Sequence, residues 1–420
     1  MSRLCLYMII AWLSSCGGNK GRYEEELDQL RLMVNSVNAQ MSTLGFPVNT
    51  DTVSLAVENA SAMSSWFNDI RDESRQENKN YVASAPPRRD DKDSRLAFYD
   101  PNTKTLVFRD DVLDKISNAY LAHELAHIYQ DQRWGLKNIW RSYQDAPSPE
   151  LFNITQYMIE GYAELVRKAY EQKYSDNSKE AAHLSFGLEK LFRNECVVCR
   201  QGQSAQNLPY TLGLKFLLHQ YQEGGWPLVE HFLKTLPAST EQILHPSKLK
   251  KDSPKQVSFP LWKENGRNAE LILDAPMGEA SLLSKLLSLG VPNFKAFRSA
   301  SGWDGDQAQI YLTNKGEKAM LWRIVFDREM DAKQLADTLE HNKDAGHVER
   351  VGRVVDWVSS SSPGLIAKLK IFLSKHPQEF GENYHDSAST EMVELKAVES
   401  GVQFFNYPNR ARIVIGPKKH

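Results

Sequence analysis

The stretch Leu121-Ala122-His123-Glu124-Leu125-Ala126-His127 carries an H-E-x-x-H pattern, and it indicates the fold of this 420-residue chain. Its apolar spacing is typical of an amphipathic helix. Residues four apart on a helix project from one face, so His123 and His127 can both reach one metal ion. Glu124 lies beside that face, where its carboxylate can take a proton from a metal-activated water. We expect a zinc site here; the alternative is a surface helix with two solvated histidines.

The segments around this motif predict a β-hairpin followed by a long helix. Residues 97–99 and 105–108 are apolar runs on either side of a turn sequence, as in a hairpin. The acidic pair Asp110-Asp111 precedes an apolar-periodic run, and Gly135 offers a C-terminal stop. We therefore expect a helix from about residue 110 to Trp134. A strand that leads directly into this helix is suited to be the edge along which an extended peptide lies.

A catalytic zinc site usually has three protein ligands, and the next suitable group in the sequence is Glu160. It lies in a segment that also looks helical, next to the small residues Gly161 and Ala163, which would let this helix pack close to the metal helix. Glu164 lies one turn further on, where it can orient a ligand histidine through its second ring nitrogen. Periodicity alone does not choose between the two glutamates as third ligand. The alternative is that both are surface residues.

The residues around the two histidines and Glu160 resemble the motifs of a known family. The decapeptide at residues 123–132, H-E-L-A-H-I-Y-Q-D-Q, and Glu160-Gly161-Tyr162-Ala163 resemble a little-characterised family of bacterial HExxH metallopeptidase-like lipoproteins, which shows H-E-L-x-H-x-x-Q-D-Q and then E-G-x-A. Further matches are S-T-E-Q-I-L-H-P at residues 239–246 and G-W-D-G-D at residues 302–306. More distantly, two histidines and a glutamate resemble the thermolysin-like zincins of the gluzincin type, although the spacing to Glu160 is longer here. The resemblance implies a zinc-peptidase fold and supplies no substrate.

Two residues are candidates for stabilising the oxyanion of a tetrahedral intermediate. Ser239-Thr240-Glu241-Gln242 is a capping-box pattern, and the helix it starts must be short because Pro246 follows His245. A histidine at such a stop can reach a cleft and stabilise the oxyanion; the alternative is a structural histidine that holds a loop. Tyr210, at the start of a predicted helix, is the second candidate.

The first sixteen residues predict a bacterial lipoprotein signal. Arg3 gives a short positive region, and the apolar run that follows is too short to span a bilayer. Leu13-Ser14-Ser15-Cys16 resembles a lipobox, so we expect residues 1–15 to be removed, Cys16 to be lipidated and residues 16–22 to form a tether. The mature protein would then be anchored to a membrane of the bacterial cell envelope, on the periplasmic side, the outer membrane included. The alternative is a plain signal peptide with an incidental cysteine.

The two remaining thiols belong to Cys196-Val197-Val198-Cys199. Two thiols exclude a four-cysteine zinc site. In an oxidising envelope compartment we expect a local disulfide between Cys196 and Cys199. Reduced thiols and a thioredoxin-like redox role are the alternatives, and no βαβ pattern supports the latter.

Elsewhere the hydrophobic pattern predicts helices at residues 23–44, 51–70, 180–193, 210–221 and 228–236. The lysine-rich residues 248–255 mark a domain boundary. Past them we expect helices at 279–289, 331–339 and 364–373, and strands at 308–312, 320–326, 351–358, 392–396 and 412–415. Asp304-Gly305-Asp306 predicts a turn before a strand, with a cation site as the alternative.

Composition is that of an ordinary globular protein, with 41% hydrophobic and 25% charged residues and a net charge of −2. Near-neutral charge without a basic stripe argues against nucleic-acid binding. We expect an α+β protein: a mostly helical zincin-like metallopeptidase domain at residues 23–250 and a small C-terminal α+β domain at residues 258–420. The predicted function is zinc-dependent hydrolysis of a peptide or protein substrate. The alternative is a catalytically inactive zincin-scaffold lipoprotein that acts as a binding or structural module, and the intact Glu124 argues against it.

Overall fold

A computed structural model describes residues 20–66, 95–140, 148–174, 207–249, 251–264, 267–342 and 344–377. Over these ranges the protein is α+β, and it divides into two units, one up to Leu249 and the other beyond it. The predicted signal segment, the lipidation site Cys16 and the pair Cys196 and Cys199 lie outside the described residues. So do the helix predicted at 180–193 and the strands predicted at 392–396 and 412–415.

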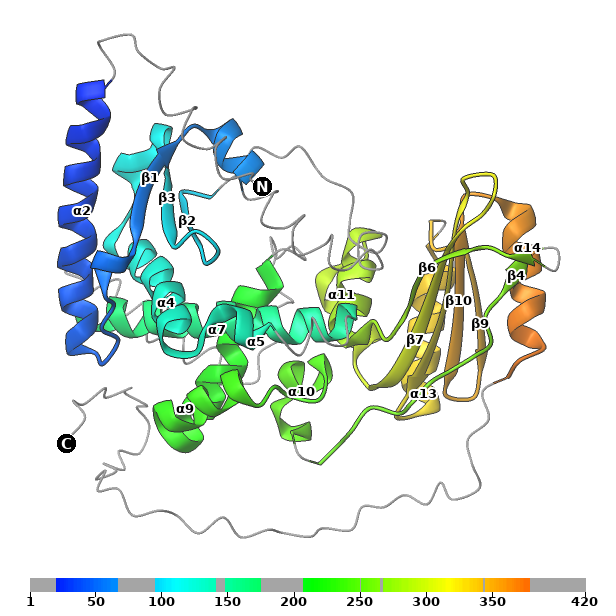
Figure 1. The fold of residues 1–420 in the computed structure, drawn as a ribbon. Coiled ribbons are helices and arrows are strands. Elements are labelled where there is room, and N and C mark those ends of the chain that lie inside the picture. Colours follow the sequence, from blue (N-terminus) through cyan, green and yellow to red (C-terminus); the bar gives the residue numbers. More distant parts are fainter. Residues whose placement is uncertain are drawn as a thin grey trace. The chain divides into compact units, whose positions relative to one another are not determined.

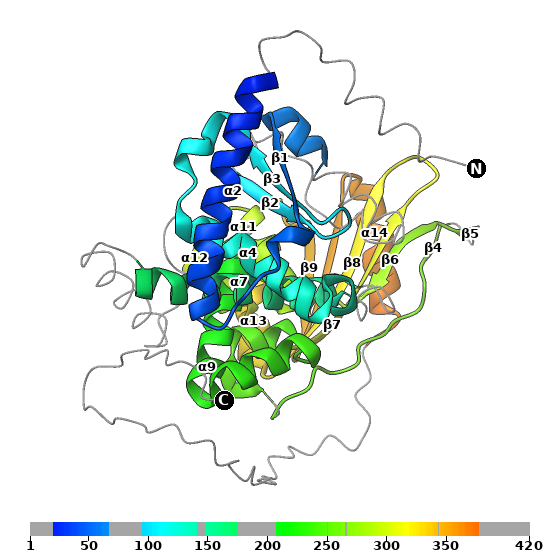
Figure 2. The ribbon, with the colours of Figure 1, turned by 60° about the vertical axis from the view of Figure 1, so that its left-hand side comes forward.

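Unit 1 is mostly helical (Figure 1). Helix α7 packs against both α4 and α9, while α2 packs against α4 and the first strand of a small sheet (Figure 2). The predicted helices at 23–44, 210–221 and 228–236 are confirmed, the last two as one kinked element. The helices and 3₁₀ turns of unit 1 are α2 (Lys20–Thr43), η1 (Thr50–Thr52), η2 (Asp110–Lys115), α4 (Asn118–Trp134), α5 (Leu136–Ile139), α7 (Pro149–Tyr174), α9 (Leu208–Lys234), α10 (Thr240–Leu244) and η5 (Pro246–Lys248).

The small sheet contains the predicted hairpin and one strand that was not predicted. β2 (Ala97–Asp100) and β3 (Thr105–Arg109) are antiparallel, which confirms the hairpin. β1 (Ser54–Glu58) pairs in parallel with β3, so the strand order is β1-β3-β2. The prediction of an unbroken helix from residue 51 was therefore wrong. In the described part of that segment, α-helix is confined to residues 60–66, and residues 51 and 52 belong to the 3₁₀ turn η1. The strand that leads toward α4 is also not an edge, because β3 is central and β1 and β2 form the two edges.

Helix α4, which carries His123 and His127, begins later than its sequence pattern predicts. Residues 110–115 form the separate 3₁₀ turn η2, within which Val112 has non-helical backbone angles. The helix itself begins after Ser117, whose hydroxyl accepts a hydrogen bond from the backbone N–H of Tyr120 at 3.1 Å. It ends at Trp134 as predicted, because Gly135 takes a positive φ of 73° and stops it.

Three consecutive residues of α4 tie three other segments to this helix. Gln130 donates to the carbonyl of Ile159 on α7 at 3.0 Å. Asp131 accepts from the Tyr99 hydroxyl at 2.8 Å and forms an ion pair with Lys104, so it holds the hairpin. Gln132 exchanges two hydrogen bonds of 2.9 Å with the backbone of Asn49, before η1. The Q-D-Q part of the motif is therefore a structural clamp.

Helices α7 and α9 approach each other through two glycines. A Cβ atom on Gly161 would lie 2.3 Å from the carbonyl carbon of Gly213, and one on Gly213 would lie 2.0 Å from the carbonyl oxygen of Tyr157. Gly161 therefore permits close packing against α9, and not against α4 as its position next to Glu160 led us to expect. Helix α9 bends at Gly224 and Gly225, where the sequence predicts a break.

The short helix α10 is confirmed with Ser239 as its cap, but the side-chain oxygen of Gln242 accepts from the backbone N–H of Ala238 and not from that of Ser239, as a capping box requires. The hydroxyl of Ser239 accepts from the backbone N–H of Gln242 at 3.3 Å. Its first residue is held by a buried carboxylate of α7: Glu150 accepts from the backbone N–H of Thr240 at 2.6 Å and from its hydroxyl at 2.8 Å. The N-terminus of α10 is thereby fixed to the first turn of α7.

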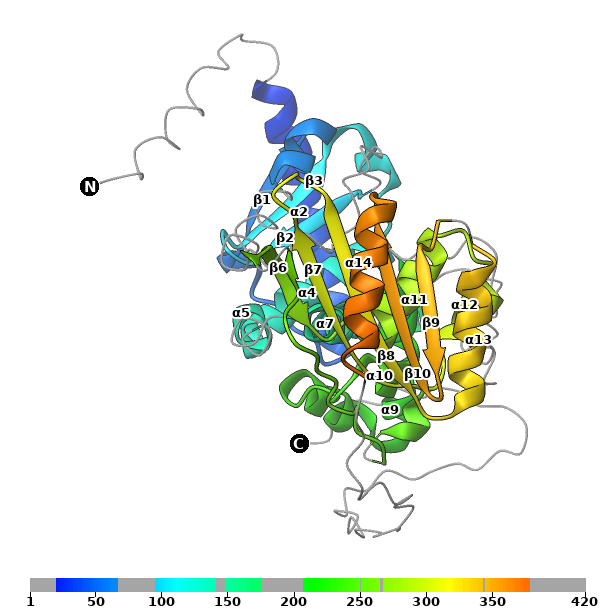
Figure 3. The ribbon, with the colours of Figure 1, turned by 90° about the vertical axis from the view of Figure 1, so that its right-hand side faces the viewer.

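Unit 2 is an antiparallel sheet of strand order β6-β7-β8-β10-β9 with helices on both faces (Figures 1 and 3). Leu365 and Leu369 of α14 pack on the face that carries Leu321, while the stacked indoles of Trp322 and Trp357 lie on the opposite face. The elements are β4 (Lys263–Glu264), β5 (Arg267–Asn268), β6 (Glu270–Ala275), α11 (Gly278–Ser288), α12 (Asn293–Ala300), β7 (Trp303–Leu312), β8 (Lys318–Phe326), α13 (Glu329–Glu340), β9 (His347–Val351), β10 (Val354–Ser360) and α14 (Pro363–Ser374).

Two expectations for unit 2 were wrong. The strand predicted at 351–358 is two strands, β9 and β10, separated by a turn in which Gly352 has a φ of +56°. The segment Asp304-Gly305-Asp306 is not a turn before a strand, because it lies inside β7. The pairing register of β7 with β8 shifts next to Gly305. There Asp306 accepts hydrogen bonds from the backbone N–H groups of Met277 and Gly278 at 2.8 and 3.0 Å, and from Trp322 at 2.8 Å. This carboxylate has a structural role at the start of α11.

Candidate metal centre

The structure brings His123, His127 and Glu160 together between α4 and α7. The Nε2 atoms of the two histidines lie 3.2 Å apart. One carboxylate oxygen of Glu160, Oε2, lies 3.4 Å from the Nε2 of His123 and 3.5 Å from that of His127. Each of the three residues thus turns one possible metal-ligand atom toward a common point. Together they form a group that could hold a metal ion.

These separations fit a tetrahedral zinc site. Ligand atoms about 2.1 Å from a tetrahedral centre are separated by roughly 3.4 Å, close to all three distances. The Oε2 atom of Glu160 is buried and makes no hydrogen bond. A buried carboxylate oxygen without a donor is costly unless a cation neutralises it. Two imidazoles and a carboxylate are also the donor types of catalytic zinc sites, so these residues fit the ion that the sequence predicts.

Glu164 contacts the other nitrogen of His123. Its Oε1 lies 3.0 Å from the Nδ1 of His123, on the side away from Glu160. Arg167 holds this carboxylate in place with a guanidinium contact of 2.6 Å, and it also bonds Glu171 at 2.7 Å. This geometry favours Glu160 as the third ligand and Glu164 as the residue that orients His123. The assignment itself stays a prediction.

Gln130, for which no individual role was predicted, contacts the other nitrogen of His127. Its Oε1 lies 2.9 Å from the Nδ1 of His127. The signal was present in the sequence, because a residue three positions after His127 lies on the same helical face. Histidines that bind metals commonly donate their second N–H to such a partner.

Glu124 is buried beside the histidines, with only 6% of its surface exposed. Burial raises the pKa of its carboxyl group, and the negative charge of Glu160 adds to this effect; the two histidines act in the opposite direction, as does a hydrogen bond with Tyr120. A raised pKa strengthens the carboxylate as a proton acceptor, which is what a general base requires.

The charges of the site are coupled. Burial alone would raise the pKa of Glu160, but the positive charge of His127 and the close contacts with both histidines lower it to about 2. Burial alone would lower the pKa of His123, but its contacts with Glu160 and Glu164 raise it to about 10. A cation that takes the place of this histidine proton would satisfy the same carboxylates.

Tyr210 lies at the site, whereas His245 is the C-cap of the short helix α10. The ring of Tyr210, in the first turn of α9, is 5.9 Å from that of His123, and its side chain is 39% exposed. The negative charge of Glu160, followed by burial, raises the pKa of this phenol, so it keeps its proton. His245 follows α10, whose first residue is bonded to Glu150, roughly 15 Å along α7 from Glu160 at 1.5 Å per residue. Its catalytic role stays a prediction.

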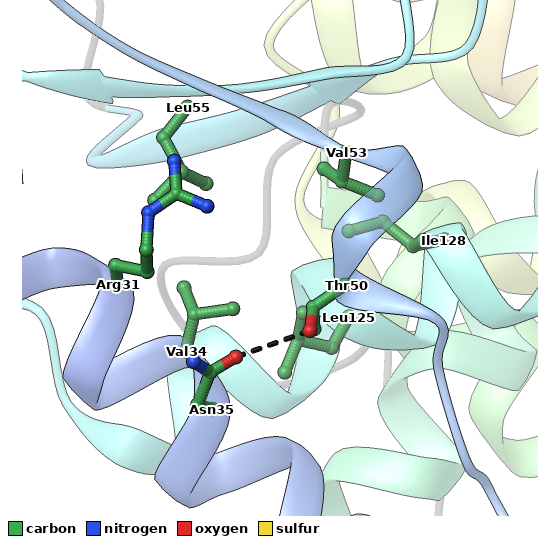
Figure 4. A pocket seen from close by; sticks show the side chains of 8 residues that line it. All are labelled: Arg31, Val34, Asn35, Thr50, Val53, Leu55, Leu125 and Ile128. Carbon is green, nitrogen blue, oxygen red and sulfur yellow. Dashed lines mark hydrogen bonds between the residues drawn. The ribbon is translucent and has the colours of Figure 1, made fainter.

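The cavity drawn in Figure 4 lies on a different side of α4. Leu125 and Ile128, which line it, point away from the face of His123 and His127. Its polar contact is a hydrogen bond of 3.1 Å from Thr50 to Asn35. Its lining is mostly aliphatic, and it carries no metal-binding group.

Comparison with known proteins gives one match. Residues 271–367, which run from β6 into α14 in unit 2, match the family described as "Domain of unknown function (DUF8575)". Searches of curated proteins and of solved structures returned no match. Within the described ranges, no helix combines the length and the apolar character needed to cross a bilayer.

Proposed function

We propose that this protein is a zinc metallopeptidase of the bacterial cell envelope that hydrolyses peptide bonds in a peptide or protein substrate. The observation that carries the proposal is the convergence of two Nε2 atoms and one unpartnered carboxylate oxygen at tetrahedral spacing, next to the buried carboxylate of Glu124. A binding protein has no need of a general base beside the metal ligands.

Each residue has a part in the proposed reaction. Zinc held by His123, His127 and Glu160 would supply a Lewis acid that lowers the pKa of water and polarises the scissile carbonyl. Glu124 takes a proton from the attacking water and gives it to the leaving amine. Tyr210 keeps its phenolic proton and can donate it in a hydrogen bond to the developing oxyanion.

The proposed fold of unit 1 is zincin-like. Its support is the order of elements: a small sheet, then the helix with both histidines, then the helix with the glutamate. The edge strand β2 is next to α4, because the hydroxyl of Tyr120 donates to the carbonyl of Ala97 at 3.0 Å. An extended peptide pairing with such an edge would lie close to the metal ligands. Lipidation of Cys16 would keep the enzyme on the periplasmic side of an envelope membrane.

The test uses the purified full chain and two variants. Wild-type protein is expected to bind about one zinc ion per chain and to cleave casein or a mixed peptide library. Glu124→Gln should keep zinc but lower turnover by at least ~100-fold, since the base is not a ligand. Glu223→Gln changes the same group on an exposed part of α9 and serves as the control.

Near-wild-type turnover in Glu124→Gln contradicts the proposed mechanism. Zinc binding by wild-type protein without cleavage of any substrate would favour the catalytically inactive binding module. Absence of stoichiometric zinc would overturn the metal site itself.

A further inference from the structure

The carboxamide of Gln130 connects a candidate metal ligand to the neighbouring helix. The side chain is completely buried. On one side its Oε1 lies 2.9 Å from the Nδ1 of His127, and on the other its Nε2 donates to the carbonyl of Ile159 at 3.0 Å. Ile159 directly precedes Glu160, so one amide contacts both ligand-bearing helices.

The chemistry of these partners fixes the direction of both hydrogen bonds. A backbone carbonyl only accepts, so the NH₂ group of Gln130 must face Ile159 and its oxygen must face His127. That oxygen also only accepts, so Nδ1 of His127 must carry a hydrogen. In the neutral imidazole the lone pair is then on Nε2, the atom that lies 3.5 Å from Glu160.

We propose that Gln130 is a positioning residue of the metal centre, which sets the tautomer of His127 and fixes α4 against α7 next to Glu160. The inference rests on the proposed function in one respect, namely that zinc is the ion bound. The Nδ1 atoms of the two histidines then have different partners. That of His123 contacts the carboxylate of Glu164, while that of His127 contacts a neutral amide, which adds no charge to the site.

Gln132 provides a matched control on the same helix. Its amide also bridges in both directions, accepting from the backbone N–H of Asn49 at 2.9 Å and donating to the carbonyl of Asn49 at 2.9 Å and to Thr52 at 3.1 Å. These three bonds go to residues in or next to η1 and not to either histidine. Replacing it removes an exposed amide clamp of the same chemistry without touching the candidate ligands.

The experiment compares Gln130→Met, Gln130→Glu and Gln132→Met in the full chain. Zinc affinity is measured by competition with a chromophoric chelator, and the tautomer of His127 by NMR of metal-free protein with ¹⁵N-labelled histidine. Gln130→Met is expected to weaken zinc binding by ~10–100-fold and to lose the fixed Nδ1–H tautomer. Gln130→Glu keeps an acceptor for Nδ1–H, so it should keep the tautomer and recover affinity relative to Gln130→Met. Gln132→Met should leave both measurements at wild-type values.

Equal zinc affinity in wild type and Gln130→Met, or equal losses in Gln130→Met and Gln132→Met, overturns the inference. If Gln130→Met does not fold, Gln130→Glu decides the matter. The Nδ1–H tautomer of His127 in that variant supports the inference, and the Nε2–H tautomer rejects it. The two proposals fail separately. Wild-type protein that binds no zinc rejects the proposed function, while an Nε2–H tautomer of His127 in the metal-free wild type rejects the role of Gln130.

Discussion

Replacing Gly213 with alanine tests how unit 1 is assembled around the candidate metal centre. The added methyl group would lie 2.0 Å from the carbonyl oxygen of Tyr157, and its surroundings are backbone atoms of α7. No rotamer change relieves such a contact, so α9 must move away from α7 by roughly 1 Å or more. Overpacking of this kind costs ~1–3 kcal/mol, while alanine recovers up to ~1 kcal/mol of helix propensity. We expect a net loss of ~1–2 kcal/mol.

The displacement should also separate binding from turnover. Tyr210 is one turn before Gly213 on α9 and moves with it, whereas the three candidate ligands are on α4 and α7. Zinc should stay bound while turnover falls. The measurements are the denaturant midpoint by tryptophan fluorescence, zinc content and peptidase rate.

Gly364 in α14 is the control, because a Cβ atom there meets nothing within 4 Å. Gly364→Ala should be neutral or stabilise unit 2 by up to ~1 kcal/mol. A Gly213→Ala protein that unfolds at the wild-type denaturant concentration or above it would refute the close approach of α7 and α9.

Two further predictions concern the ligands and the anchor. Glu160→Ala should come out of dialysis essentially free of zinc, whereas Glu164→Ala should retain it with ~10–100-fold weaker affinity, because a carboxylate that orients a histidine contributes less than a ligand. Zinc per protein for both variants decides this, and the reverse order would transfer the ligand role to Glu164. Cys16→Ala should move the protein from the membrane fraction to the soluble or unprocessed fraction; wild-type protein found wholly in the soluble fraction contradicts lipid anchoring.

Local sequence patterns predicted the elements that local forces determine. The hairpin, the end of α4 at Gly135 and the cap at Ser239 depend on turn residues and capping groups that lie within a few positions of each other. The strand β1 was missed because its identity comes from pairing with β3, some fifty positions further along the chain. Its short apolar run fits a helix and a strand equally well, so tertiary pairing decides the outcome.

The residues of the candidate site could be predicted from the sequence, but the way in which α7 packs against α4 could not. Helical spacing placed His123 and His127 on one face, but it could not say which nitrogen of each ring would meet which carboxylate. That depends on the axial position and rotation of α7 against α4, which the amide of Gln130 and the contact between the two helices determine. The role of Gly161 was wrong for the same reason, because periodicity does not reveal which neighbouring helix a small residue faces.

The bond between Glu150 and Thr240 has a consequence for the order in which unit 1 can form. These residues are 90 positions apart, and α10 has only five residues. A helix of that length has no independent stability in water, so α10 exists only once the intervening chain has brought its first turn to α7. The same bond sets a lower limit on chain length: a fragment that stops before residue 240 removes two donors from a buried carboxylate. We therefore expect the smallest autonomous piece that carries the candidate metal centre to extend through α10, well past the last candidate ligand.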